Sequence, residues 1–343
     1  MDKIVECVPN FSEGRNIETI NAIAEAVRSV QHAHLLNVEP DKDYNRVVVT
    51  FVGDPQIIVE AAFQATKIAA ERIDMRAHTG GHPRMGATDV CPFIPVRGVT
   101  MDDCIQLANI YGKRVAEELH VPVYLYGGAA RAPERKLLSD IRKGEYEGLE
   151  EKLRDPRWKP DYGEPIFNAK SGATVTGART FLIAYNVNLS TNDVAVANEI
   201  AQRIRESGRI KKDANGTTIK DENGKAVRIP GALKVTQAMG VLMERNNIAQ
   251  VSINILDFNV TSIHVVFEEV KREAQALGTE ATGSEIVGLV PLEAILQAGK
   301  FYTRKSSKTT TDEKELVVTA IHALGLSQLE SFVPEKKIIE YQI

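Results

Sequence analysis

The sequence lacks the features that mark several large classes of protein. Its 343 residues include only three cysteines and one tryptophan, so a disulfide network does not define the fold. It has no run of roughly 18 apolar residues, which argues against a membrane-spanning helix. The formal net charge of −4 gives no support to nucleic-acid binding, which favours a basic face. The GxxxxGK and GxGxxG spacings of phosphate-binding loops are also absent.

The amino-acid composition and length also bear on the cellular compartment and on the number of domains. The first eleven residues have neither the basic start nor the apolar core of a signal peptide, so we expect a cytoplasmic protein. Cys7 and Cys91 lie in strand-like runs, and we expect both to be small buried apolar residues in a reducing compartment. The length predicts two domains.

Hydrophobic periodicity predicts the same element order twice. The first cycle has strands at 3–8, 34–38, 46–52 and 90–96, with helices that begin near Asn16 and Asp54. The second has strands at 180–188, 233–243, 248–256 and 286–290, with helices that begin near Thr191 or Asn192 and at Thr261. We therefore expect an α+β protein of two similarly wound split-βαβ, ferredoxin-like subdomains, residues 1–180 and 181–343. Each is predicted to be a mixed sheet with helices on one face.

A polar segment interrupts the second cycle at residues 209–230. It contains the Asn-Gly pairs at 215–216 and 223–224 between short alternating runs, which predicts a β-hairpin or a three-stranded flap. Six Lys and Arg against three Asp and Glu leave two interpretations open, a solvated surface flap or a site that attracts an anion.

The loop before the strand at 90–96 carries the residues best suited to chemistry. Gly80-Gly81 allows close approach of the backbone to a ligand, and Pro83 restricts the conformation of His82. A histidine held in this way beside Arg84 could exchange a proton near neutral pH, although a turn or capping role is the alternative. His78 lies four residues before His82, but the two glycines disfavour a helix and no Glu follows His78, so we expect no metal site.

A second loop, at residues 163–172, is long and bounded by glycines. Ordered loops of this length usually bind something or connect domains, and the residues alone leave both open.

Long motifs in both predicted domains are similar to one family. They are VECVPNFSEG at 5–14, TFVG at 50–53, HPRMGATDVCPFIPVRGVTMDDC at 82–104, VPVYLYG at 121–127, LVPLEAI at 289–295 and IIEYQI at 338–343. The chain resembles the glutamate formimidoyltransferases, a family also found as the first part of formimidoyltransferase-cyclodeaminase. The resemblance implies that the sequence holds no cyclodeaminase portion.

The resemblance implies an enzyme that transfers the formimino group of N-formimino-L-glutamate to N5 of tetrahydrofolate. The products would be L-glutamate and 5-formiminotetrahydrofolate, in histidine breakdown. Tetrahydrofolate would be a co-substrate in a charged tunnel between the subdomains of a homodimer, with no metal, and the length of its glutamate tail stays open. The family's catalytic histidine falls on His82. Its folate-binding loop falls on Gly163, Glu164, Pro165, Ile166, Phe167, Asn168, Ala169, Lys170, Ser171 and Gly172.

The chain departs from a vertebrate relative at three places. Glu39 stands where that relative would carry aspartate, Lys170-Ser171 replaces an aromatic residue in the folate loop, and the 209–230 flap is extra. We hypothesise that His82 takes the N5 proton and protonates the leaving nitrogen, with Glu39 as an orienting carboxylate. Arg84 is the first choice to bind a substrate carboxylate. The weaker choices are Arg76, Arg97, Arg179 and Lys170.

Three rival functions remain open from the sequence. One is ATP-driven cyclisation of 5-formyltetrahydrofolate, as in a cyclo-ligase, which would need a nucleotide site. Another is a folate-binding module without turnover. The third is metal-dependent hydrolysis of formiminoglutamate, which would proceed without folate.

Overall fold

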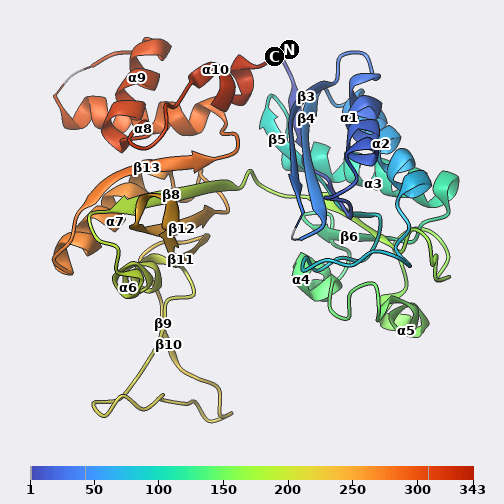
Figure 1. Cartoon of the computed structure of the whole chain (residues 1–343), viewed down its shortest axis with the longest axis horizontal. Helices are drawn as coiled ribbons and strands as arrows, with labels where there is room; N and C mark the ends of the chain where they lie inside the picture. Colours follow the sequence, from blue (N-terminus) through green and yellow to red (C-terminus); the bar gives the residue numbers. More distant parts are fainter. Residues whose placement is uncertain (1, 43, 308) are drawn as a thin grey trace. The chain divides into compact units, whose positions relative to one another are not determined.

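The structure, a computed structural model, describes residues 2–42, 44–307 and 309–343. The chain divides into two compact units, Met1–Thr180 and Phe181–Ile343, and each is described by itself (Figure 1).

A seven-stranded sheet forms the centre of the first unit. Its strands are β1 (Ile4–Cys7), β2 (Asn10–Phe11), β3 (His34–Asp41), β4 (Arg46–Gly53), β5 (Thr88–Arg97), β6 (Val123–Gly127) and β7 (Thr174–Ala178). They follow the order β1-β4-β2-β5-β7-β6, with β3 on β4 and a further pairing of β1 with β5. The pairings of β7 with β5 and β6 are parallel and the others are antiparallel. The expectation of a mixed sheet is confirmed for this unit.

Three helices cover one face of this sheet: α1 (Ile17–Arg28), α2 (Ile58–Arg72) and α3 (Met101–Leu119) (Figure 1). The helix starts follow from local chemistry, because the Asn16 side chain accepts the Thr19 N–H and Thr100 with Asp103 forms a capping box. Asp54 begins a turn, and α2 starts at Ile58.

Helices also lie on the opposite face, so the prediction of helices on one face is wrong for the first unit. Residues of the short helices α4 (Leu138–Ile141) and α5 (Leu149–Arg154) pack with Val90, Tyr124 and Val175 of the sheet. The reason is that β5, β6 and β7 are apolar on both sides, and parallel strands of this kind require cover on both faces.

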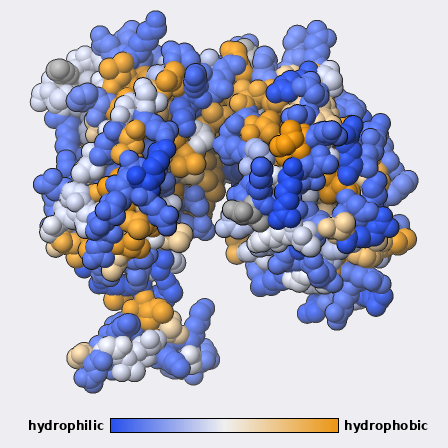
Figure 2. Space-filling model, in the orientation of Figure 1, coloured by the Kyte–Doolittle hydropathy of each residue, from blue (hydrophilic) through white to orange (hydrophobic). Residues whose placement is uncertain are grey.

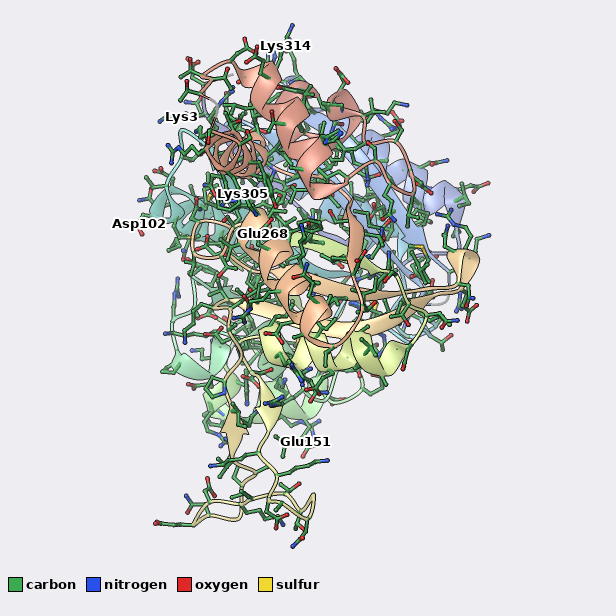
Figure 3. All side chains as sticks on the ribbon, turned by 90° about the vertical axis from the view of Figure 1, so that its left-hand side faces the viewer. Lys3, Asp102, Glu151, Glu268, Lys305 and Lys314 are labelled. Carbon is green, nitrogen blue, oxygen red and sulfur yellow. The ribbon has the colours of Figure 1, made fainter. Side chains whose placement is uncertain are left out.

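The second unit is built on a four-stranded sheet of order β11-β12-β8-β13, in which every pairing is antiparallel. The prediction of a mixed sheet is therefore wrong here. The strands are β8 (Ile183–Leu189), β11 (Thr236–Met243), β12 (Ile248–Ile255) and β13 (Ala281–Val287). The helices are α6 (Val194–Ile204), α7 (Ile263–Ala276), α8 (Leu292–Lys305), α9 (Glu313–Leu324) and α10 (Pro334–Lys337). Helices α7 and α8 are joined by Lys305 Nζ and Glu268 Oε2, 2.5 Å apart (Figure 3).

Several element ends differ from the prediction. The strand expected from residue 180 begins at Ile183, and the one expected at 286–290 is Ala281–Val287. Asp193, rather than Thr191 or Asn192, caps α6, because its Oδ1 accepts the Ala195 N–H at 2.8 Å. Strand β7 was not predicted, since its five residues follow a loop and include a glycine.

The flap at 209–230 is confirmed as a hairpin element. Strands β9 (Arg209–Ile210) and β10 (Arg228–Ile229) pair at its base. In each Asn-Gly turn one aspartate accepts two backbone N–H groups: Asp213 from 215 and 217, and Asp221 from 223 and 225. The flap is mostly hydrophilic with an apolar base (Figure 2), where Ile210 and Ile229 are 41% and 39% exposed.

The cysteines are placed as expected. Cys7 and Cys91 are buried free thiols on the paired strands β1 and β5, with 3.4 Å between their sulfurs. In the described part of the chain, no helix combines the length and apolar character needed to cross a bilayer.

Candidate active site

The loop that carries His82 joins α2 to β5 and lies against the β3–β4 turn. Asn45 holds it, because its Nδ2 donates to Thr79 O at 2.8 Å and its O accepts from His78 Nε2 at 2.9 Å. Gly80 is required at the contact, since a Cβ there would lie 2.4 Å from Tyr44 O. The turn between two strands therefore fixes where His82 lies.

The side chain of His82 is half-buried and contacts a guanidinium. Its Nε2 lies 3.1 Å from Nη1 of Arg46, the first residue of β4, and its ring meets Tyr44 edge-on at 6.3 Å. A guanidinium only donates hydrogen bonds, so Nε2 is the acceptor and the ring is neutral in this arrangement. His82 is thus held as a base with its lone pair directed at a cation.

The electrostatics of the loop favour the neutral ring. Burial, followed by the charges of Arg46 and Arg142, lowers the pKa of His82 to about 4, although the Pro83 backbone and Asp41 act in the opposite sense. Because the pKa in the unfolded chain is higher, about 6.5, the neutral ring contributes stability above that pH. This contribution is lost as the pH falls towards 4.

NMR titration of the His82 ring, assigned with a His82→Gln variant, is expected to give a midpoint near 4. The physical reason is that the ring is half-buried and that protonation would also put a third positive charge beside Arg46 and Arg142. A midpoint at the ordinary value of about 6.5 would contradict the geometry described here.

Arg84 lies next to this site but is already paired. It is 6% exposed; Nη1 donates to Glu145 and Glu147 at 3.0 and 2.9 Å, and Nη2 to Glu147 at 2.6 Å. Its Nε donates to His78 Nδ1 at 3.2 Å. His78 therefore uses both ring nitrogens to tie the loop together, and two carboxylates occupy the fork of Arg84.

A buried ion pair stabilises the segment that follows His82. Asp89 Oδ1 accepts the Met85 N–H at 2.9 Å, and Oδ2 pairs with Arg142 Nη2. Burial raises the pKa of Asp89, whereas Arg142 works against this shift. The pair joins the start of β5 to the end of α4 and places the charge of Arg142 near His82.

Glu39 lies on β3 and is exposed. Its Oε1 accepts from Asn37 Nδ2 at 2.6 Å. In the β3–β4 register it stands opposite Val48, two residues from Arg46 on the same face of the sheet. Among the described residues, its hydrogen-bond partner is thus Asn37, and it is Arg46 rather than Glu39 that lies within hydrogen-bond distance of His82.

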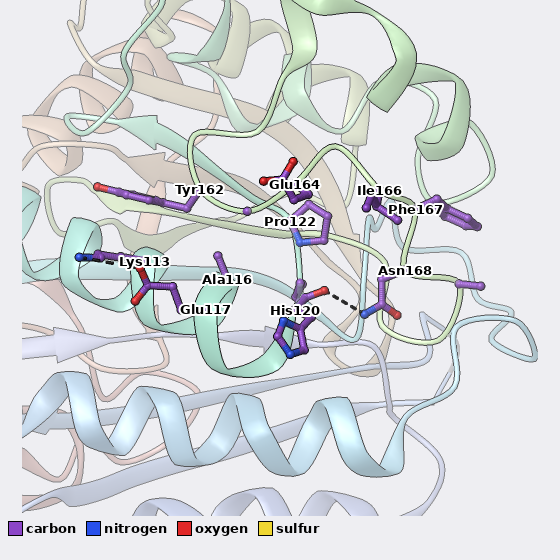
Figure 4. A pocket seen from close by; sticks show the side chains of 13 residues that line it. Lys113, Ala116, Glu117, His120, Pro122, Tyr162, Glu164, Ile166, Phe167 and Asn168 are labelled. Carbon is purple, nitrogen blue, oxygen red and sulfur yellow. Dashed lines mark hydrogen bonds and ion pairs between the residues drawn. The ribbon is translucent and has the colours of Figure 1, made fainter.

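The predicted folate loop, 163–172, lines a cavity of about 720 Å³ against the end of α3. Figure 4 shows Glu117 and His120 at the end of α3 on one side of it, and Glu164 and Ile166 of the loop on the other. Asn168 Nδ2 donates to His120 O at 3.2 Å and fixes this part of the loop. The walls are largely apolar, with a few charged side chains at the rim. The lining residues are Lys113, Ala116, Glu117, His120, Val121, Pro122, Tyr162, Gly163, Glu164, Ile166, Phe167, Asn168 and Ala169.

The far end of this loop is tied to the segment after His82. Ala87 N donates to Ser171 O at 2.9 Å, and Gly172 bridges to Gly86. A Cβ on Gly172 would lie 2.1 Å from Met85 O, and φ is +67°, so glycine is required. His82 itself lines a separate narrow void with His78, Arg46 and Arg84. The structure therefore joins the two predicted segments through the backbone but lines different cavities with them.

The weaker candidates are dispersed. Arg76 pairs with Asp74 at 2.5 Å, Lys170 Nζ donates to Glu71 O at 2.8 Å, and Arg179 donates to Thr180 O at 3.0 Å. Arg97 ends β5. Sequence reasoning missed Arg46, although a charged residue at the start of the apolar run Val47–Val52 was a usable signal. No group of three or more His, Cys, Asp or Glu among the described residues is arranged to hold a metal.

Comparison with known proteins identifies the family. The "Formiminotransferase domain, N-terminal subdomain" matches residues 4–179, and the "Formiminotransferase domain" matches 184–343. The formimidoyltransferase-cyclodeaminase of Rattus norvegicus is 49% identical over 344 residues, covering 100% of this chain and 60% of the relative. The glutamate formimidoyltransferase of Streptococcus pyogenes serotype M1 is 42% identical, covering 88% of this chain and 94% of the relative. That of Thermoplasma acidophilum is 43% identical, covering 87% and 92%.

This chain thus spans about 60% of the length of the formimidoyltransferase-cyclodeaminase and more than 90% of the length of the two glutamate formimidoyltransferases. Matches over both of its units show that the chain belongs to the formiminotransferase family.

Proposed function

We propose that this protein is a glutamate formimidoyltransferase, which moves the formimino group of N-formimino-L-glutamate to N5 of tetrahydrofolate. Two relatives that carry this name cover most of the chain. The observation that carries the proposal is the state of His82: a half-buried, neutral imidazole whose Nε2 is an acceptor. Such a nitrogen is suited to take a proton from an attacking amine.

The reaction needs one proton acceptor and one proton donor. N5 attacks the amidine carbon of the donor, so that an N5–C bond forms and a tetrahedral intermediate appears. His82 takes the N5 proton and passes it to the glutamate nitrogen. The C–N bond to that nitrogen then breaks and L-glutamate leaves. General acid-base catalysis of this kind contributes roughly 10²- to 10⁴-fold.

Other residues are proposed in supporting roles. The loop from Gly163 to Gly172 would bind folate, and its cavity is large enough for an aromatic ring system. Phe167, whose ring lies 5.5 Å from that of Tyr146, is our proposal for the ring that would stack on the pterin. Glu39 would orient His82 after a rotamer change on β3. For Arg84 to bind a substrate carboxylate, that carboxylate must displace Glu145 or Glu147.

The strand orders support two ferredoxin-like subdomains. In the first unit, β3-β4-β1-β5 are neighbours through hydrogen bonds, and in the second β11-β12-β8-β13 are. In each unit these four strands follow one another along the chain, and in the sheet they lie in the order second, third, first, fourth. A helix follows the first and the third strand in both units, as in a ferredoxin-like fold. We also propose a homodimer, which rests on the sequence resemblance, and a cytoplasmic location.

Incubation of the purified protein with formiminoglutamate and tetrahydrofolate is expected to yield L-glutamate and 5-formiminotetrahydrofolate, detected by mass spectrometry. A chelator is expected to leave the rate unchanged, because the protonated amidine is itself a good electrophile. Three outcomes would contradict the proposal: glutamate release without folate, ATP consumption with 5-formyltetrahydrofolate in place of transfer, and folate binding without any turnover.

A further inference from the structure

Arg46 differs from the other arginines around His82 in what it contacts. Its Nη1 reaches Asn10 Oδ1 at 3.3 Å and His82 Nε2 at 3.1 Å, and both acceptors are neutral. Its Nε is buried and lacks a hydrogen-bond partner in the described part of the chain. A half-buried guanidinium with neutral partners and an unused donor is incompletely satisfied.

The neighbouring arginines are each neutralised. Arg84 forms ion pairs with Glu145 and Glu147, and Arg142 forms one with Asp89. Asp41 stands opposite Arg46 across the β3–β4 pairing, and its Oδ1 accepts the Tyr44 N–H at 2.9 Å. Within the described residues no carboxylate forms an ion pair with Arg46, whose position at the start of β4 fixes it beside the catalytic ring.

We propose that Arg46 binds a carboxylate of the formimino donor, and that this binding releases Nε2 of His82 for proton transfer. The inference rests on the proposed function, and it names the receptor for the donor. A carboxylate can accept two parallel hydrogen bonds from a guanidinium edge. Arg46 would then exchange the weaker contact with His82 for the charged one, and the lone pair of Nε2 would be open to the N5 proton.

The exchange also changes the strength of the base. The charged groups that act on the His82 ring come from β4 (Arg46), the end of α4 (Arg142) and β3 (Asp41), while His78, Arg84 and Asp89 line the same void. A bound carboxylate offsets the charge of Arg46, which is a cause of the lowered pKa second only to burial. The pKa of His82 therefore rises towards its ordinary value only when the donor is present, and a general base works best near the operating pH.

The kinetic test compares Arg46→Gln with wild type on three donors: formiminoglutamate, formiminoglycine and formimino-4-aminobutyrate. The last two lack the side-chain and the α carboxylate, respectively. With formiminoglutamate we expect kcat/KM to fall by about 10- to 100-fold, the effect of one charged hydrogen-bonding interaction. For the donor that lacks the carboxylate bound by Arg46, the variant is expected to be no slower than wild type, because Arg46 then contributes no binding and still occupies Nε2 of His82. The matched control is Arg28→Gln, which removes an exposed arginine that pairs with Glu25 on α1.

An unchanged KM in Arg46→Gln, or the same loss with all three donors, would overturn the inference while leaving the transferase activity of the wild type intact. If the wild type itself transfers nothing, the proposed function fails instead. Arg46→Lys serves as a second variant in case Arg46→Gln is poorly folded. It keeps the positive charge but cannot form two parallel hydrogen bonds, so its kcat/KM for formiminoglutamate is expected to lie between those of wild type and Arg46→Gln.

A second readout does not depend on turnover. Addition of L-glutamate, the product that carries both carboxylates, is expected to raise the NMR-measured pKa of His82 in the wild type and in Arg28→Gln. In Arg46→Gln the pKa is expected to start higher and to be unaffected by glutamate. A glutamate-dependent shift that survives in Arg46→Gln would assign the carboxylate to another residue.

Discussion

Replacement of His82 by alanine is expected to slow formimino transfer by about 10²- to 10⁴-fold, because it removes the imidazole that we propose relays the proton from N5 to the leaving nitrogen. Folate binding is expected to be retained, since the loop at 163–172 lines a different cavity. The measurements are single-turnover rates at saturating substrates and the Kd of tetrahydrofolate by fluorescence or calorimetry.

The matched control is His322→Ala, an exposed histidine in the last turn of α9, which is expected to behave as wild type. Full activity in the His82 variant would exclude the proposed proton transfer by His82. Loss of folate binding together with activity would instead assign His82 a structural role in the loop.

Replacement of Asp89 by alanine is expected to lower the free energy of unfolding of the first unit by about 3–5 kcal/mol, the range for breaking a buried ion pair. The substitution leaves the Arg142 guanidinium, whose side chain is 16% exposed, without its carboxylate. It also removes the acceptor of the Met85 N–H. Urea unfolding followed by the fluorescence of Trp158, the only tryptophan of the chain, reports on this unit because Trp158 packs on Tyr124.

Two comparisons make the stability experiment specific. Asp140→Ala breaks a partly exposed i,i+3 pair with Lys143 and is expected to cost no more than about 1 kcal/mol. The double variant Asp89→Leu with Arg142→Met removes both charges and is expected to recover much of the lost stability. If Asp89→Ala and Asp140→Ala were equally stable, the Asp89–Arg142 pair would not be a support of the His82 loop.

The order of elements and the loop of His82 could be predicted because their signals are local. A continuous apolar run marks β4, a cap such as Asn16 marks a helix start, and two glycines before His82 with a proline after it mark a constrained loop. Strand β7 gave no such signal, because five buried residues with a glycine read as part of the preceding loop.

The partners of the site residues could not be predicted, for a different reason. His82 contacts a residue 36 positions earlier, and Arg84 contacts carboxylates 61 and 63 positions later. These pairings depend on how strands and short helices assemble, which no periodicity specifies. The choice of Arg84 as a free carboxylate receptor followed from its adjacency to His82 in sequence, whereas in space Arg46 is the arginine next to the ring.

The flap shows how a chain can gain length without disturbing its sheet. Arg209 and Ile229 face each other across the β9–β10 pair, so the chain leaves and re-enters the unit at one spot. The turns between them are closed by their own aspartates. Homologues are accordingly free to shorten, lengthen or replace this segment, and it offers a place where a foreign peptide can be carried while β8, β11 and β12 keep their register.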